Sequence, residues 1–158
     1  MIKKYLPPDP SNKVNNFLSE LAKTPLPTSS SNRGRLVFAM DATASREPTW
    51  ERTCQLQAEM FNVTDGLGSL SIQLCYYRGL AEFNTFNWSD DGTELSKMMS
   101  GVRCLGGHTQ IYKVLKNALA QADIKAVIFI GDAIEENPDI LCQLAGELAL
   151  LNTPLFIF

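Results

Sequence analysis

A short apolar run that ends abruptly in oxygen-bearing side chains is the feature that most constrains the fold of this chain. The run Leu36–Met40 contains only apolar residues, and Asp41, Thr43 and Ser45 follow at alternate positions. Uninterrupted apolar runs are typical of strands buried on both faces of a parallel sheet. The three polar side chains would therefore gather at the carboxyl end of a central strand, where open α/β sheets bind their ligands.

Two interpretations of Asp41, Thr43 and Ser45 are open at this point. Hard oxygen donors that are mostly neutral suit a hard divalent cation, and Mg²⁺ in particular keeps part of its coordination for water or an outside ligand. The same residue types also cap helices and form hydrogen bonds within turns without any metal. These residues by themselves do not decide between a metal site and a local turn.

Length and composition favour one ordinary globular domain. The chain has 158 residues, of which 45% are hydrophobic and 20% charged, which allows a single domain with a substantial core. Lys and Arg total 14 against 17 for Asp and Glu, giving a formal charge of −3 without any basic cluster. We therefore expect no nucleic-acid partner.

Export and membrane insertion are not expected from the sequence. Residues 1–8 include two lysines, but no apolar segment of a signal peptide follows them, and no apolar run approaches the roughly 18 residues of a membrane span. The cysteines are widely spaced and lie in or beside apolar patterns; they are Cys54, Cys75, Cys104 and Cys142. We expect buried, reduced thiols in a cytoplasmic protein rather than disulfides or a zinc site.

Hydrophobic spacing predicts strands that alternate with helices. Strands are expected at about 35–41, 70–76, 126–130 and 154–158, and helices at about 48–61, 95–99, 111–122 and 138–148. A turn at Arg78–Gly79 and an extended stretch through Phe83 and Phe86 predict a hairpin whose second arm lies at the sheet edge. The sequence thus predicts a Rossmann-like α/β fold: a mostly parallel central sheet, helices on both faces and one antiparallel edge strand.

The two ends of the chain are expected to depart from this pattern. Residues 1–34 contain several prolines and the polar run Thr28–Asn32, which predicts a flexible arm that either packs on the domain or docks to another protein. A short amphipathic helix is predicted within the arm by the spacing of Val14, Phe17, Leu18 and Leu21. The chain ends at Phe158 within an apolar segment, so we expect residues 35–158 to form a domain that lacks its last helix and strand.

Two further oxygen-bearing side chains are expected at the same sheet edge as Asp41. Thr109 follows a Gly-Gly-His turn at the start of a helix, and Asp132 follows the strand at 126–130. The carboxyl ends of neighbouring parallel strands meet at one edge, so these side chains should converge. Five such residues at one edge favour a metal site over a set of unrelated caps.

This set resembles the metal-ion-dependent adhesion site (MIDAS) of von Willebrand factor A-type (VWA) domains. That family carries Asp-x-Ser-x-Ser after its first strand, a Thr in a later loop and an Asp after its fourth strand. The matching residues lie within about 35–158, with a Thr in place of the usual middle Ser; they are Asp41, Thr43, Ser45, Thr109 and Asp132. The resemblance implies hydroxyls in contact with Mg²⁺ or Mn²⁺, aspartates acting directly or through water, and a Glu or Asp of a protein partner at the open position.

The resemblance also implies a partner-binding rim around the ion. Gly106 and Gly107 would let the backbone approach the ion closely, and His108 would line the binding face or make only a local hydrogen bond. Bacterial relatives of such domains often work beside AAA+ ATPases, which makes one a candidate partner. The implied activity is metal-bridged protein binding without catalysis.

A different class of protein shares part of the pattern. Asp41 after a strand, with Glu135 and Glu136 beyond Asp132, also resembles Mg²⁺-dependent phosphohydrolases of the haloacid dehalogenase type, whose strand-end Asp is the nucleophile. Their motif is Asp-x-Asp, and Thr43 occupies the general-acid position, where a hydroxyl cannot do that work near neutral pH. A third alternative is a scaffold without a metal, in which the two glutamates only stabilise a helix start.

Overall fold

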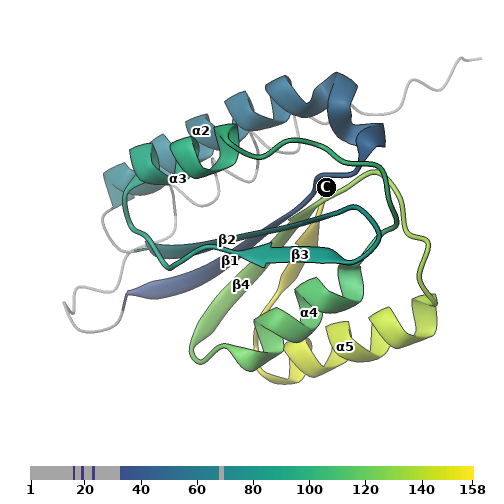
Figure 1. Ribbon diagram of the computed structural model, residues 1–158. Coiled ribbons are helices and arrows are strands. Elements are labelled where there is room, and N and C mark those ends of the chain that lie inside the picture. Colours follow the sequence, from purple (N-terminus) through teal and green to yellow (C-terminus); the bar gives the residue numbers. More distant parts are fainter. Residues whose placement is uncertain (1–15, 17–18, 20–22, 24–32, 68–69) are drawn as a thin grey trace, which may run out of the picture.

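A single five-stranded sheet forms the centre of the computed structural model, which describes residues 16, 19, 23, 33–67 and 70–158 (Figure 1). Across the sheet the order is β3-β2-β1-β4-β5. The strands are β1 (Gly34–Asp41), β2 (Leu70–Arg78), β3 (Glu82–Thr85), β4 (Ile124–Ile130) and β5 (Leu155–Ile157). β2, β1, β4 and β5 run parallel, whereas β3 pairs antiparallel with β2 at the edge. The predicted sheet, including its antiparallel edge strand, is confirmed.

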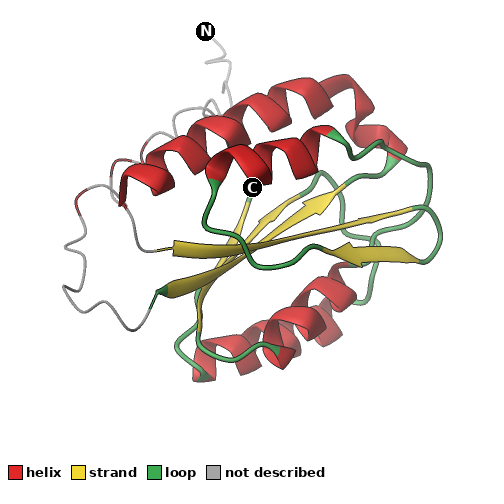
Figure 2. Ribbon diagram, turned by 60° about the vertical axis from the view of Figure 1, so that its left-hand side comes forward, coloured by secondary structure: helices red, strands yellow, loops and turns green. Residues whose placement is uncertain are grey.

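Helices cover both faces of the sheet, as expected (Figure 2). They are α2 (Glu47–Leu67), α3 (Gly92–Ser100), α4 (Ile111–Ala120) and α5 (Pro138–Leu150), with a short 3-10 turn, η1 (Ala44–Arg46), before α2. α2 and α3 pack on one face, and α4 and α5 pack on the other (Figure 1). α4 ends two residues before the predicted end, because the backbone at Gln121 is extended.

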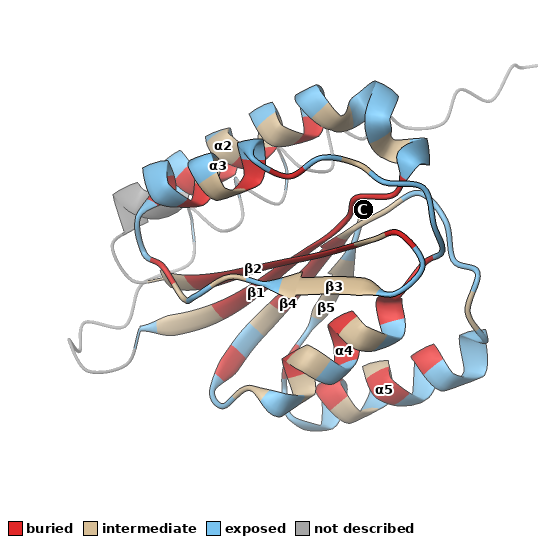
Figure 3. Cartoon of the chain, in the orientation of Figure 1, coloured by how far each residue is buried: buried red, intermediate tan, exposed pale blue. Residues whose placement is uncertain are grey.

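The apolar run of β1 is buried on both sides, as its sequence predicts (Figure 3). Side chains alternate across a strand, so Val37 and Ala39 join the core beneath α4 and α5, while Leu36, Phe38 and Met40 join the core beneath α2 and α3. β1 pairs with β2 on one side and β4 on the other. This central place brings the carboxyl end of β1 between the ends of its two neighbours.

Two helix starts have caps that the local sequence supplies. The Asp91 carboxylate accepts hydrogen bonds from the backbone N–H groups of Thr93 and Glu94 at the start of α3. Asn137 caps α5 in the same way, immediately before Pro138. α4 differs, since the residue before it, Gln110, makes no side-chain cap. The backbone N–H groups at the start of α4 therefore need an acceptor from elsewhere in the chain.

The cysteines follow the prediction only in part. All four are free thiols, and Cys75 is buried in the core, but Cys54 and Cys104 are only half-buried and Cys142 is exposed. The prediction that Cys142 is buried is wrong, because it lies on the outer side of α5, whose buried residues are Leu141, Leu144 and Leu148. A helix turns about 100° per residue, so the position after a buried Leu can point to solvent.

Two other expectations concern the arm and the membrane. The amphipathic helix predicted from Val14, Phe17, Leu18 and Leu21 lies outside the described residues, and the division into an arm at 1–34 and a domain at 35–158 stays a prediction. Within the part of the chain that the structure describes, no helix combines the length and the apolar character that crossing a membrane requires.

Candidate metal site

Asp41 lies at the very end of β1 and is almost completely buried, with 1% of its surface exposed. Its Oδ1 atom accepts two hydrogen bonds, from the backbone N–H of Thr43 at 2.8 Å and from the Thr43 hydroxyl at 2.6 Å. The other carboxylate oxygen, Oδ2, has no hydrogen-bond partner among the described residues. The local turn predicted as one alternative is thus present, and it leaves half of a buried carboxylate unused.

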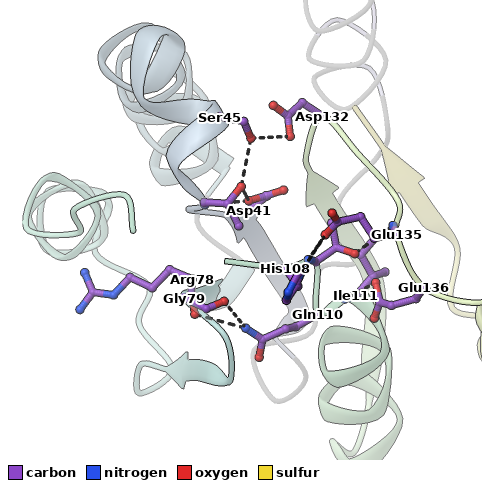
Figure 4. Close-up of polar contacts among 12 residues, drawn as sticks. Asp41, Ser45, Arg78, Gly79, His108, Gln110, Ile111, Asp132, Glu135 and Glu136 are labelled. Atoms are coloured by element: carbon purple, nitrogen blue, oxygen red, sulfur yellow. Dashed lines mark hydrogen bonds and ion pairs between the residues drawn. The ribbon is translucent and has the colours of Figure 1, made fainter. Parts of the chain in front are cut away.

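The Ser45 hydroxyl connects this turn to the end of β4 (Figure 4). The hydroxyl oxygens of Thr43 and Ser45 are 3.1 Å apart, and Ser45 donates to Asp132 Oδ1 over 3.3 Å. Thr43 has an extended backbone just before η1, and Ser45 lies within η1, which turns both hydroxyls to the same side. The structure therefore joins four of the predicted site residues into one continuous set of oxygen atoms; they are Asp41, Thr43, Ser45 and Asp132.

The protons of this set are fewer than its contacts. Each hydroxyl has a single proton, and the short contact to Asp41 takes that of Thr43. The Ser45 proton then serves either Thr43 at 3.1 Å or Asp132 at 3.3 Å, and the other of these two contacts has no proton. Both oxygens consequently keep lone pairs that a cation can use.

Thr109 is held by a different partner. Its hydroxyl accepts a hydrogen bond from the backbone N–H of Glu135 at 3.0 Å, and the Glu135 carboxylate accepts one from the backbone N–H of Thr109 at 2.8 Å. Thr109 is buried, and its hydroxyl proton is not used in these bonds. Thr109 thus sits at the same end of the sheet as predicted, but it is bonded to the loop after β4 rather than to Ser45 or Asp41.

Glu136, the second of the two glutamates beyond Asp132, lies at the start of a helix, α4, to which the sequence did not assign it. The two carboxylate oxygens of Glu136 accept hydrogen bonds from the backbone N–H groups of Ile111 and Tyr112, at 3.0 and 2.7 Å. Glu136 therefore caps α4 from a distance, in place of Gln110. The expected helix-start role is real, but it serves α4 and not the helix that follows in sequence, and no local signal marks a cap that comes from another loop.

The predicted rim consists of exposed residues, and one of its glycines has a clear steric reason. A Cβ atom on Gly107 would lie 1.7 Å from the carbonyl oxygen of Gly79, whereas one on Gly106 would meet only Ala44, at 3.8 Å. The N–H of His108 donates to the same Gly79 carbonyl, and its imidazole lies 3.6 Å from the Glu135 carboxylate. Gly107 is thus required where this loop packs on the β2–β3 turn.

The donor chemistry of the site fits a hard divalent cation. The converging groups are hydroxyls and carboxylates, which are ligands that Mg²⁺ and Mn²⁺ prefer, and Asp41 Oδ2 is a buried acceptor without a donor. Among the described residues, no group of three or more His, Cys, Asp or Glu side chains that could hold a metal ion is found. Asp41, Thr43, Ser45 and Asp132 could hold such an ion, with Thr109 at the adjoining loop.

The geometry gives the phosphohydrolase alternative less support. That reading needs Glu135 and Glu136 for Mg²⁺, but both carboxylates accept hydrogen bonds from backbone N–H groups around the start of α4. Thr43 donates its proton to Asp41, so its hydroxyl is already engaged with the proposed nucleophile. Among the described residues, no contact favours Asp41 as a catalytic nucleophile over Asp41 as a metal ligand.

Comparison with known proteins identifies the fold. No family model matches the chain, and no curated protein matches it in sequence. Among solved structures, the SpRpn10 VWA domain matches with a TM-score of 0.61 and 12% identity, over 78% of this chain and 73% of that one. The vWF domain of the pili tip protein Mfa5 from Porphyromonas gingivalis matches with a TM-score of 0.57 and 13% identity, over 67% of this chain and 40% of that one.

A third match is the pilus adhesin SpaC from Lactobacillus rhamnosus GG, with a TM-score of 0.56 and 11% identity. The match covers 67% of this chain but only 15% of the adhesin. Identities this low establish the arrangement of strands and helices and nothing finer. On that arrangement, the chain has the fold of a von Willebrand factor A-type domain.

Proposed function

We propose that this domain binds a protein partner through one Mg²⁺ or Mn²⁺ ion, held by Asp41, Thr43, Ser45, Thr109 and Asp132. A Glu or Asp side chain of the partner would complete the coordination of the ion. The observation that carries the proposal is the hydrogen bond from Ser45 to Asp132, because it links the segments that follow β1 and β4 around one set of oxygen atoms. Turn hydrogen bonds around Asp41 alone do not require Asp132.

The charge balance of the site supports binding of an outside carboxylate. Only two of the five residues carry a charge, and together they balance the charge of a divalent ion. A third or fourth carboxylate would make the site negative and repel another anion, whereas this donor set does not. Asp41 is buried and Asp132 is exposed, so the open side of the site faces solvent. A partner's carboxylate is the ligand that such an exposed, electron-poor ion attracts most strongly.

The structural neighbours agree with a binding role. Two of them are described as a pilus adhesin and a pili tip protein, and a third as a VWA domain. For the present chain, an AAA+ ATPase as partner is an inference from the family resemblance. A cytoplasmic location is an inference from the spacing of the cysteines and from residues 1–8. We assign binding to the site, and no catalysed reaction.

Calorimetric titration of Mg²⁺ and Mn²⁺ into the wild type and Ser45→Ala tests the proposal. Ser45 is exposed, so its hydroxyl can be removed with little effect on the core. Ser100→Ala is the matched control, because Ser100 is an exposed hydroxyl at the end of α3. We expect Ser45→Ala to weaken metal binding about tenfold or more, and Ser100→Ala to leave it unchanged. Equal affinity in all three proteins would refute the metal assignment.

A phosphatase assay on a generic phosphate ester separates the remaining alternatives. Turnover that disappears in Asp41→Ala would mean that the domain is a phosphohydrolase. Metal binding without turnover supports the binding domain, and neither binding nor turnover would leave a scaffold. Metal binding without turnover would justify a search for the partner's acidic residue.

A further inference from the structure

Tyr77 lies beside Asp41 in the sheet, yet nothing in the sequence marks it as part of a site. Tyr77 and Asp41 are register partners at the ends of the parallel strands β2 and β1. The ring of Tyr77 packs in the core beneath α4 and α5, together with Ala39. Because alternate residues of a strand share a face, Asp41 projects to the same side of the sheet as Ala39, and therefore as Tyr77.

The two side chains have complementary unmet needs. Tyr77 is fully buried, with 0% of its surface exposed, and its hydroxyl has no hydrogen-bond partner among the described residues. Asp41 is also buried, and its Oδ2 atom lacks a partner within the same part of the chain. Buried polar groups in folded proteins are nearly always hydrogen-bonded, so two such groups on adjacent residues of one face call for a common explanation.

The tyrosine supplies the kind of group that Asp41 lacks. A phenolic O–H has one proton to donate, whereas an ionised carboxylate only accepts. The ring itself is fixed by stacking on Phe129, with centroids 6.1 Å apart, so the hydroxyl is held near one position.

We propose that Tyr77 is a positioning residue of the site, whose hydroxyl donates a hydrogen bond to Asp41 Oδ2 while Thr43 donates to Oδ1. The carboxylate would then be held from both oxygens. A carboxylate oxygen has two lone pairs, so this bond leaves Oδ2 able to accept a further ligand. Tyr77 does not contact the ion in this arrangement. It fixes the carboxylate to which the Thr43 hydroxyl donates.

The inference rests on the proposed metal site for its effect on affinity, but not for the contact itself. Tyr77→Phe removes only the hydroxyl and keeps the ring that stacks on Phe129. Tyr76→Phe is a matched control from the next position, because Tyr76 is also buried but packs on the opposite face, beside Phe86. Both variants keep a ring of the same shape in the core.

The first measurement is the Mg²⁺ affinity of the wild type, Tyr77→Phe and Tyr76→Phe by calorimetry. Groups that orient a metal ligand typically change affinity by about 10- to 100-fold when they are lost. We expect Tyr77→Phe to weaken Mg²⁺ binding about tenfold and Tyr76→Phe to leave it unchanged. Equal affinity of Tyr77→Phe and the wild type would overturn the positioning role.

The second measurement is a double-mutant cycle of Tyr77→Phe and Asp41→Asn on urea unfolding in the presence of a chelator. If the two groups are bonded, the folding equilibrium constant of the double mutant will differ by about fivefold or more from the value expected for two independent substitutions. Independent effects would overturn the contact. Because no metal is present, the cycle reports on the contact between Tyr77 and Asp41 even if calorimetry detects no metal binding. A lack of metal binding in the wild type would refute the proposed function instead.

Discussion

The side chain of Thr109 and the side chain of Glu135 each bond to the other residue's backbone. The Thr109 hydroxyl accepts from the Glu135 N–H at 3.0 Å, and the Glu135 carboxylate accepts from the Thr109 N–H at 2.8 Å. These reciprocal bonds tie the loop before α4 to the loop after β4. The position of Thr109 at the site is therefore set by a loop that lies 26 residues away in sequence.

Removing the Glu135 carboxylate should loosen this connection. We expect Glu135→Ala to lower the free energy of unfolding by about 1 kcal/mol, because a partly buried N–H loses its acceptor while the Thr109 hydroxyl keeps its own bond. Glu135→Gln, which retains an acceptor oxygen, should lose less. Urea unfolding measures both, with Glu59→Ala on the exposed side of α2 as control. Equal stability of Glu135→Ala and Glu59→Ala would contradict the role of the bond.

Loss of Glu136 should weaken the first turn of α4. Its carboxylate accepts from two backbone N–H groups that have no cap from Gln110, so Glu136→Ala should cost about 1–2 kcal/mol of stability. Glu136→Gln keeps an acceptor but loses the charge that favours a helix N-terminus, and its cost should be smaller. Chemical denaturation followed by circular dichroism gives both values. The prediction fails if the two substitutions have the same small effect.

Adjacent glycines of the rim should respond differently to alanine. In Gly107→Ala the new Cβ would lie 1.7 Å from the Gly79 carbonyl oxygen, so the loop must move away from the β2–β3 turn. We expect a loss of about 1–3 kcal/mol, as for other overpacked sites. Gly106→Ala meets only ordinary contact at 3.8 Å and should be tolerated. Thermal and urea unfolding of the pair would test this, and equal tolerance of both would contradict the close approach.

The hydroxyl of Thr43, rather than its methyl group, should be what the site needs. Thr43→Val keeps the shape but removes the donor to the buried Asp41 carboxylate, which should cost about 1.5–3 kcal/mol. Thr43→Ser keeps the donor, so it should lose less than about 1 kcal/mol, from one buried methyl group. Unfolding in a chelator separates these effects from metal binding. A valine variant as stable as the serine variant would count against the bond.

Thiol reactivity should follow burial. Cys142 is exposed, whereas burial raises the pKa of Cys75 to about 12. At pH 8 only about one Cys75 in ten thousand would be the reactive thiolate, even before its inaccessibility is considered. A thiol reagent should therefore label Cys142 first and Cys75 only after unfolding, with Cys142→Ser as the control that loses the fast phase. Rapid labelling of Cys75 in the folded protein would contradict its placement.

Folded and unfolded forms should also differ in their response to alkaline pH. Folding raises the pKa of the Cys75 thiol. Above the ordinary pKa of a thiol, the unfolded chain therefore loses this proton while the folded protein keeps it. The thiol's contribution to stability is complete below that value and decreases as the pH rises toward about 12. Comparing unfolding of the wild type and Cys75→Ala between pH 8 and 10 should show a steeper loss in the wild type. Parallel losses would contradict this.

The sequence by itself was enough for the fold class, because the signals that decide it are local. An apolar run such as Leu36–Met40 favours a strand buried in the interior. The helical spacing of Ile111, Val114, Leu115 and Ala118 gives a helix with one apolar face that can cover a sheet. Alternation of such segments favours parallel strands. The observed succession of strands and helices along the chain follows from these patterns, and so does the convergence of Asp41, Thr43, Ser45 and Asp132 at one sheet edge.

Only the tertiary structure decided which side chains bond to which. Ser45 meets Asp132 across 87 positions of sequence, and Glu136 caps a helix that begins 25 residues before it. Tyr77 comes to lie beside Asp41 through strand register alone. Hydrogen bonds act over about 3 Å and demand direction, whereas burial demands only that a side chain leave water. Patterns of hydrophobicity therefore predict where strands and helices go, but the partners of each polar group depend on distances that the folded chain alone establishes.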